Sequence, residues 1–199
     1  MPFIKVIDPE SSHGRLTKIY KRVSGPDGQV DNVLQIHSLR PHSLEGHMAL
    51  YKAVLHHPGN KLPLWFLETI GVLVSMLNKC SYCFQHHSTG LKRLLAGEPD
   101  RFEAIVAELK LDEPGTPFSP AERAALAYVR KLTNAPGTIT HQDMESMRTA
   151  GLQDGEILEV NQVAAYFAYA NRTVTGLGVS TEGEKLGLSP ENVEGWTHQ

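Results

Sequence analysis

The spacing of apolar residues is the feature that most constrains the fold of this chain. Apolar residues recur every three or four positions along nearly the whole sequence, whereas alternating β-branched runs bounded by turns are nearly absent. The first pattern gives an α-helix one apolar face, and the second would indicate β-strands. At 199 residues the chain is long enough to bury a core as one domain. We therefore expect a single all-α domain over residues 1–199.

Capping and breaking residues mark the ends of the expected helices. Asp8 with Pro9 is expected to start the first helix, and Ser119 with Glu122 has the spacing of a capping box. The most apolar window, 62–77, is shorter than the ~20 residues that cross a bilayer, so it predicts a buried helix. A polar tail over 181–199 is expected to pack poorly. The expected helices cover about 9–23, 31–38, 41–55, 62–78, 80–95, 99–109, a stretch from 120, 141–150 and 154–171.

Charge and cysteine content exclude several classes of protein. Nineteen Lys and Arg residues against twenty-two Asp and Glu residues give a net charge of −3, which argues against general nucleic-acid binding. Two cysteines are too few for the disulfide framework of a small secreted domain. The first eight residues lack the apolar stretch of a signal peptide, and no membrane segment is evident. We therefore expect a cytoplasmic protein that binds neither nucleic acid nor membrane.

The segment from Glu68 to His87 holds the residues best suited to chemistry. If Cys80 begins a helix, Cys83 lies one turn further along the same face and His87 stacks over it. A helix N-terminus stabilises an anion and an imidazole can accept the thiol proton, so both features lower a thiol pKa. A second thiol within reach can convert an oxidised sulfur into a disulfide. The spacing therefore predicts a redox-active pair of thiols.

Glu68 stands in an otherwise apolar helix, where an unpaired carboxylate would be costly to bury. Such a group could orient His87 or transfer a proton through water. It could equally pair with an arginine or a helix end across the core. The sequence leaves both interpretations open.

The order Glu, eleven residues, Cys-x-x-Cys, three residues, His resembles the signature of alkylhydroperoxidase D-like (AhpD-like) proteins of the carboxymuconolactone decarboxylase superfamily. The stretches 37–95 and 166–178 also resemble its branch of uncharacterised peroxidase-related proteins. This resemblance implies an AhpD-like helical bundle with a core over about 31–180. It further implies a homo-oligomer (dimer, trimer or hexamer) and thiol-dependent reduction of hydroperoxides without a metal or organic cofactor.

The resemblance also implies roles for individual residues. Cys83 matches the cysteine that attacks the peroxide and Cys80 its resolving partner, while His87 with Glu68 matches the proton relay. An external dithiol, as a small molecule or a reductant protein, is then needed to reduce the disulfide. Tyr82 departs from the archetype, which has a second histidine between its cysteines. Helix position alone favours the other order, because Cys80 lies nearer the helix N-terminus and should have the lower pKa.

Several other interpretations compete with the peroxidase. The chain could be a non-enzymatic, oligomeric binding protein or a redox sensor whose cysteines are small buried apolar residues. A lactone decarboxylase-type enzyme gives the dithiol no clear task, and a thioredoxin-like fold lacks its βαβ pattern. A zinc site would use a weaker spacing than most zinc motifs; its ligands would be Cys80, Cys83, one of His86 and His87, and one of His56 and His57.

A weak internal similarity suggests two related halves. Glu68 precedes an apolar run that reaches Cys80 twelve residues later, and Glu122 precedes one that reaches Asn134 at the same spacing. Two ordinary amphipathic helices would give the same match. A duplicated bundle is therefore a hypothesis that rests on very few positions.

Overall fold

The computed structural model describes residues 1–25 and 28–187, and within these ranges the chain is all-α with no strand. This confirms the expected fold class. A π-helical turn, Lys52–His56, follows α3, and a short 3₁₀ turn, Pro136–Thr138, follows α7. The α-helices are α1 (Arg15–Val23), α2 (Asn32–Gln35), α3 (Pro41–Tyr51), α4 (Leu64–Leu77), α5 (Ser81–Leu94), α6 (Pro99–Glu108), α7 (Pro120–Asn134), α8 (His141–Thr149) and α9 (Asp154–Gly176).

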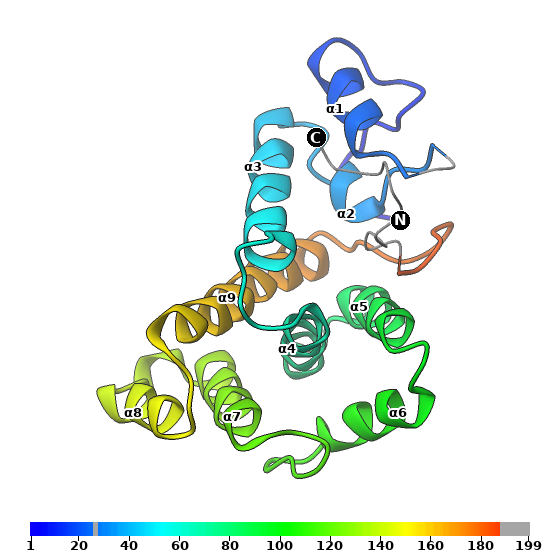
Figure 1. Cartoon of the computed structure of the whole chain (residues 1–199). Coiled ribbons are helices and arrows are strands. Elements are labelled where there is room, and N and C mark those ends of the chain that lie inside the picture. The colour runs from blue at the N-terminus through cyan, green and yellow to red at the C-terminus, as the bar shows by residue number, and fades with distance from the viewer. Residues whose placement is uncertain (26–27, 188–199) are drawn as a thin grey trace.

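Helix α4 lies at the centre of the main bundle, against α5, α7 and α9 (Figure 1). Every residue from Phe66 to Ser75 is buried, as expected of a helix that is apolar on all faces. Helix α9 crosses closely at Gly71, where an added Cβ would lie 2.2 Å from the ring of Phe167. No helix among the described residues has the length and apolar character needed to cross a membrane.

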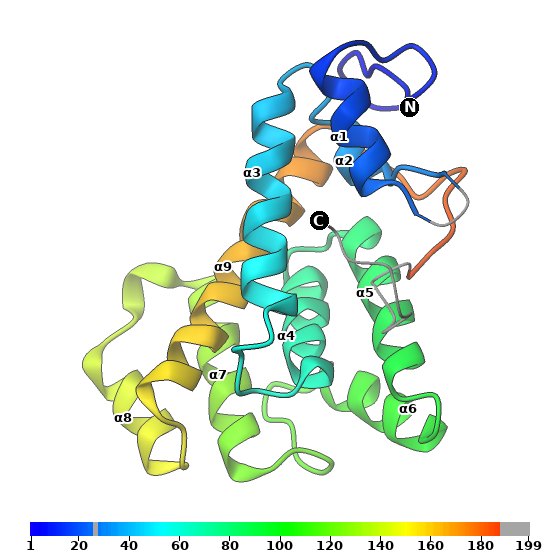
Figure 2. The same cartoon turned by 45° about the horizontal axis from the view of Figure 1, so that its top comes forward.

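A second, smaller core lies between the first three helices, at the end of the molecule where α3 projects from the bundle (Figure 2). Helix α3 continues into the π-helical turn, which contacts both α4 and α9. The two cores are therefore joined through the end of α3. The buried residues of the smaller core are Leu16, Ile19, Tyr20, Val23, Val30, Leu34, Leu44 and Met48.

The predicted start of α7 is confirmed. The N–H of Glu122 donates to Oγ of Ser119 (3.3 Å), and the N–H of Ser119 donates to the carboxylate of Glu122 (2.7 Å). Glu68, by contrast, is fully buried in the middle of the bundle. The two glutamates that suggested related halves therefore have different positions and different partners.

Two expected boundaries were wrong. Helix α1 begins at Arg15 rather than behind Asp8, because Asp8 accepts the N–H of Ser11 (2.7 Å) in a local turn and Gly14 adopts a positive φ of 61°. Helix α9 runs to Gly176, one turn beyond the expected end.

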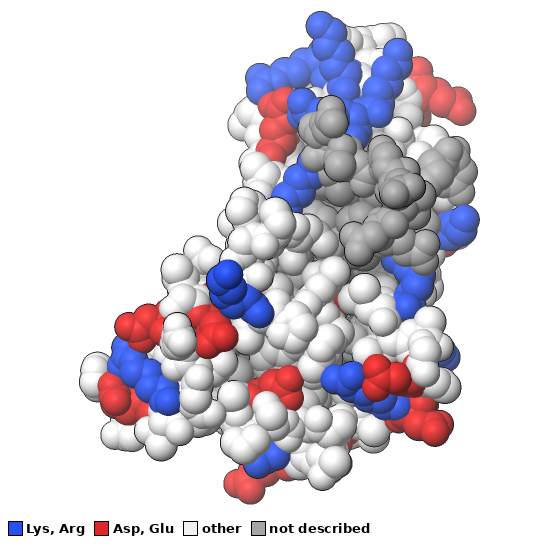
Figure 3. Space-filling view, viewed as in Figure 1, with Lys and Arg blue, Asp and Glu red and all other residues white. Residues whose placement is uncertain are grey.

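Part of the expected polar tail is also packed, contrary to the sequence-based expectation. Residues 180–187 lie along α2 and α5, and the remaining tail residues, 188–199, lie outside the described part of the chain. Elsewhere on the surface, Lys and Arg side chains gather over the α1 end of the face shown in Figure 3. Over the lower part of that face acidic and basic side chains are interspersed.

Candidate functional site

The thiol site is built on the turn that joins α4 to α5. The N–H of Lys79 donates to the carbonyl of Met76 (3.0 Å), and the N–H of Cys80 donates to the carbonyl of Ser75 (2.9 Å). This pair of bonds is the Schellman motif, which ends a helix with one residue in the left-handed conformation. Lys79 takes that conformation, with φ 56°. Cys80 thus completes the end of α4 and is also the N-cap of α5.

Cys80 has the lower pKa of the two thiols, at about 6. The largest cause is a hydrogen bond from the thiol of Cys83, followed by the Cys83 N–H, the Thr175 side chain and the charge of His87. Burial opposes these effects, because Cys80 is only 2% exposed. The free N–H groups at the start of a helix favour an anion, so the site stabilises a thiolate at Cys80.

Cys83 lies one turn along α5 and is also buried, with 3% exposure. Its hydrogen bond to Cys80, together with burial and the negative charge on Cys80, raises its pKa above the usual range. The side chain of Asn171 acts in the opposite direction. These effects favour a proton on Cys83 and a negative charge on Cys80.

His87 and Glu68 are hydrogen-bonded to each other, which is one of the two arrangements that the sequence left open. Nδ1 of His87 lies 2.7 Å from Oε2 of Glu68, and the Glu68 side chain is fully buried. A carboxylate oxygen can only accept, so Nδ1 donates in this hydrogen bond and Nε2 is the ring nitrogen left for proton transfer. The ring edge of Phe167 packs on the imidazole at 4.5 Å between centroids. Glu68 therefore orients a histidine.

Helix α9 supplies two further polar contacts to the thiols, Asn171 and Thr175. The Asn171 amide donates to Oγ of Ser75 (3.1 Å) and accepts from the Asn78 amide (3.0 Å), which ties α9 to the end of α4. Sequence analysis placed neither Asn171 nor Thr175 at the site. Their spacing of four residues, which puts two polar groups on one helix face, is the signal that could have indicated them.

The π-helical turn after α3 brings a second histidine towards the pair. Nε2 of His56 is buried without a hydrogen-bond partner among the described residues, and its ring packs edge-on to Tyr51 at 4.7 Å. Burial lowers the pKa of His56; the charge of Glu68 raises it and that of His87 lowers it. His56 therefore lies within electrostatic range of Glu68 and His87.

The residues considered for zinc are not gathered into one site. Within residues 1–25 and 28–187, no cluster of three or more His, Cys, Asp and Glu side chains has the arrangement of a metal site. His87 instead pairs with Glu68, and Nε2 of His86 lies 3.0 Å from the carboxylate of Glu184. Tyr82 donates to the same carboxylate (3.0 Å) and not to the thiols.

Comparison with known proteins supports the fold. No protein-family model matches the chain, and no curated protein is significantly similar to it. An AhpD-core, peroxidase-related protein from Ralstonia eutropha superposes with a TM-score of 0.75 at 22% identity, over 90% of this chain and 91% of its own. A peroxidase-related protein from Silicibacter sp. gives 0.71 at 25% identity, over 90% and 88%.

A third solved structure adds a different activity on the same fold. The debrominase Bmp8, in complex with 2,3,4-tribromopyrrole, superposes with a TM-score of 0.70 at 16% identity, over 92% of this chain and 95% of its own. The two peroxidase-related structures support the resemblance to the AhpD-like superfamily and its peroxidase-related branch, whereas the debrominase shows the shared fold alone. At these identities the similarity establishes the fold and leaves the reaction to be argued from the site.

Proposed function

We propose that this chain, which has the AhpD-like fold, is an enzyme that reduces hydroperoxides with Cys80 and Cys83. The arrangement of two thiols beside the His87–Glu68 pair supports this proposal. With a pKa of about 6, Cys80 is largely ionised at neutral pH, and the thiolate is the nucleophilic form of cysteine. The second thiol is already hydrogen-bonded to the first, which is the proximity that disulfide formation requires.

The reaction begins when the thiolate attacks the terminal oxygen of the hydroperoxide. As the Cys80 thiolate forms, His87 takes up the thiol proton. An S–O bond then forms, the O–O bond breaks, and the leaving alkoxide takes that proton from His87 and departs as an alcohol. The thiol of Cys83 then attacks the resulting sulfenic acid, forming the disulfide and releasing water. The dithiol loses two electrons and the peroxide gains two. An external dithiol reduces the disulfide by thiol–disulfide exchange.

The resemblance and the electrostatics disagree about which cysteine attacks first. The resemblance assigns the attack to Cys83, whereas the hydrogen bonds of the site favour a negative charge on Cys80. We assign the first attack to Cys80, because the ionised sulfur is the nucleophile. Trapping the sulfenic acid in Cys80→Ser and in Cys83→Ser separates the two orders. Under our assignment only Cys83→Ser accumulates it, and accumulation only in Cys80→Ser would restore the order implied by the resemblance.

The first experiment counts thiols. The protein is reduced, treated with a chelator and mixed with one equivalent of cumene hydroperoxide, beside a small-molecule dithiol as reference. We expect both thiols to disappear together and much faster than those of the reference. Loss at the reference rate would contradict the proposal and favour a binding protein. Loss without turnover in the presence of excess dithiol would favour a redox sensor.

A brominated pyrrole is the second electrophile to test, because a structural neighbour was solved with one bound. Reaction with 2,3,4-tribromopyrrole but not with the hydroperoxide would keep the dithiol as the catalytic group and show the proposed substrate class to be wrong. Reaction with the hydroperoxide alone supports the proposal.

The role of the carboxyl group can be tested by Glu68→Gln, which preserves shape but removes the charge that orients and polarises His87. Positioned acid–base groups contribute roughly 10²- to 10⁴-fold, so we expect peroxide turnover to fall by about 10²-fold or more. Glu103→Gln removes an exposed charge and is the matched control. Equal turnover in the two variants would remove Glu68 from the mechanism.

A further inference from the structure

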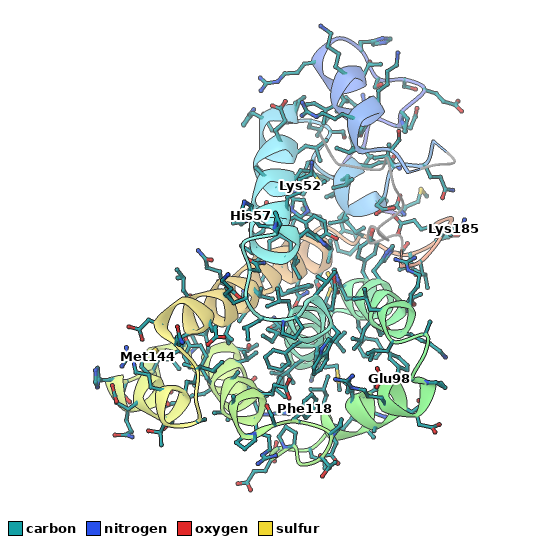
Figure 4. The ribbon with its side chains drawn as sticks, in the orientation of Figure 1. Lys52, His57, Glu98, Phe118, Met144 and Lys185 are labelled. Atoms are coloured by element: carbon teal, nitrogen blue, oxygen red, sulfur yellow. The ribbon has the colours of Figure 1, made fainter. Side chains whose placement is uncertain are left out.

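The C-terminal strap, residues 180–187, lies across helices α2 and α5. The carbonyl of Ser180 accepts from the side chain of Asn32 (3.0 Å), and the hydroxyl of Thr181 donates to Gln85 on α5 (3.0 Å). At Gly187, the last described residue of the strap, φ is 67° and an added Cβ would lie 2.6 Å from the side chain of Thr89. Figure 4 shows Lys185 on this segment, at the α5 side of the molecule.

One carboxylate joins the strap to both helices. The side chain of Glu184 is only 6% exposed, and it lies 3.0 Å from the hydroxyl of Tyr82 and 3.0 Å from Nε2 of His86. It also accepts the backbone N–H of Asn32 at the start of α2. The Tyr82 hydroxyl in turn accepts the N–H of Val33 (3.1 Å). Hydrogen bonds to charged groups are stronger than neutral ones, so the three contacts of Glu184 attach the strap firmly to both helices.

The attached elements cover the thiols. Cys80 and Cys83 form a small buried cluster with Tyr82 and Val174, and Val33 of α2 and Val179, which precedes the strap, pack against it. Tyr82 therefore belongs both to the cover of the thiols and to the attachment of the strap. A small oxidant needs only a narrow approach, whereas reduction of a disulfide needs a second sulfur in line with the bond.

We propose that Glu184 is a specificity-determining residue: by holding the strap closed over the first turn of α5 it admits small reagents to the dithiol and excludes bulky ones. The inference deepens the proposed function, since it concerns which oxidants and reductants reach that same site. Tyr82, at the position where the archetypal protein has a histidine, acts here as an anchor of the strap.

The test measures access directly, without relying on peroxide chemistry. The reduced full-length protein is labelled with iodoacetamide and, separately, with a maleimide carrying a long polyethylene glycol chain, and the ratio of bulky to small reagent rates is determined. Removing a charged hydrogen-bond partner should favour opening by about tenfold or more. We expect Glu184→Ala to raise the ratio by that factor, Glu184→Gln by less, and the wild-type ratio to be low.

Glu182→Gln is the matched control, since it removes the same charge from an exposed side chain of the strap. Tyr82→Phe loses only the hydroxyl and should fold normally, so it tests the same attachment if Glu184→Ala is misfolded. It should also raise the ratio of bulky to small reagent rates. A ratio unchanged in both Glu184→Ala and Tyr82→Phe, or raised equally in Glu182→Gln, overturns the inference. A raised ratio in a protein inert to hydroperoxides would instead overturn the proposed function and leave the role of the strap standing.

Discussion

The turn between α4 and α5 and the turn between α8 and α9 share one backbone motif but differ in the residues that fill it. After α8, the N–H of Gly151 donates to the carbonyl of Arg148 (2.9 Å), and the N–H of Leu152 donates to the carbonyl of Met147 (3.1 Å). Lys79 and Cys80 show the same hydrogen-bond pattern after α4. Gly151 occupies the left-handed position, where glycine is favoured. The α4–α5 turn places a lysine there, which costs about 1–2 kcal/mol.

The N-termini of the helices that follow these turns, α9 and α5, also differ in their stabilising residues. Glu156, in the first turn of α9, accepts the N–H of Gln153 (2.8 Å), and Asp154 adds a second carboxylate there. Helix α5 has no acidic residue in its first turn, and its N-cap side chain is a cysteine sulfur rather than an oxygen. The turn that carries the thiols thus omits the usual stabilising residues and leaves its helix N-terminus to a thiolate. Similar backbone geometry carries stabilising residues in one place and, in the other, the thiols of the proposed reaction.

Giving the α4–α5 turn a conventional N-cap residue should have the largest effect on activity. Cys80→Ser supplies a preferred N-cap whose oxygen can accept the N–H of Cys83. We expect hydroperoxide turnover to be abolished while the free energy of unfolding in urea stays equal or rises by up to about 1 kcal/mol. A loss of stability of several kcal/mol would mean that Cys80 is chiefly a packing residue.

The pH dependence of Cys80 labelling tests whether the α4–α5 turn stabilises a thiolate, and its expected effect is of intermediate size. The rate of iodoacetamide reaction with Cys80 should follow a midpoint near pH 6, well below the ~8.5 of a free cysteine. Cys83→Ala removes the largest cause of that shift, so its midpoint should move upward. Because the folded pKa is the lower one, Cys80 stabilises the fold fully above the unfolded pKa, and that contribution is lost as the pH falls through about 6. A wild-type midpoint near 8.5 would contradict the electrostatic account.

Substitutions at Lys79 and Gly151, the residues with positive φ in the two turns, should have the smallest effects, and these should be on stability. Lys79→Gly relieves the positive φ and should raise the free energy of unfolding by about 1 kcal/mol, with little change in the labelling rate of Cys80. Gly151→Ala is the reverse change, and it should lower stability by a similar amount although there is open space for the Cβ. If Lys79→Gly slows labelling markedly, the lysine has a role at the thiols beyond its backbone.

Local signals in the sequence predicted most of the fold and the thiol motif. The capping box at Ser119 and Glu122 lies within four residues, and the relation of Cys80, Cys83 and His87 follows from helical spacing alone. Such features depend on neighbours along the chain. The predicted start of α1 was wrong because the Asp8 side chain accepts the N–H of Ser11 in a local turn. Such turns are an alternative to helix capping for the side chain of an aspartate.

Contacts between distant segments could not be predicted in this way. Asn171 and Thr175 reach the thiols from α9, and Glu184 meets Tyr82 across a sequence separation of 102 residues. A polar residue in a tail has many possible partners, and only the packing of helices selects one. The π-helical turn that carries His56 likewise depends on one extra residue in a helix, which periodicity over a few turns does not reveal.

The ring of Phe167 lies between Gly71, where α4 and α9 cross, and the imidazole of His87. One side of the ring fills the space above Gly71, and the His87 imidazole meets it at an interplanar angle of 84°. Any group added at position 71 must push the ring, and a ring in a close-packed core passes the displacement to its neighbour. Gly71, the smallest residue in α4, thus sets how closely the Phe167 ring approaches α4 and where the imidazole lies. A single methyl group added at the helix crossing would shift the imidazole of the proposed proton relay without touching a thiol or a charged group.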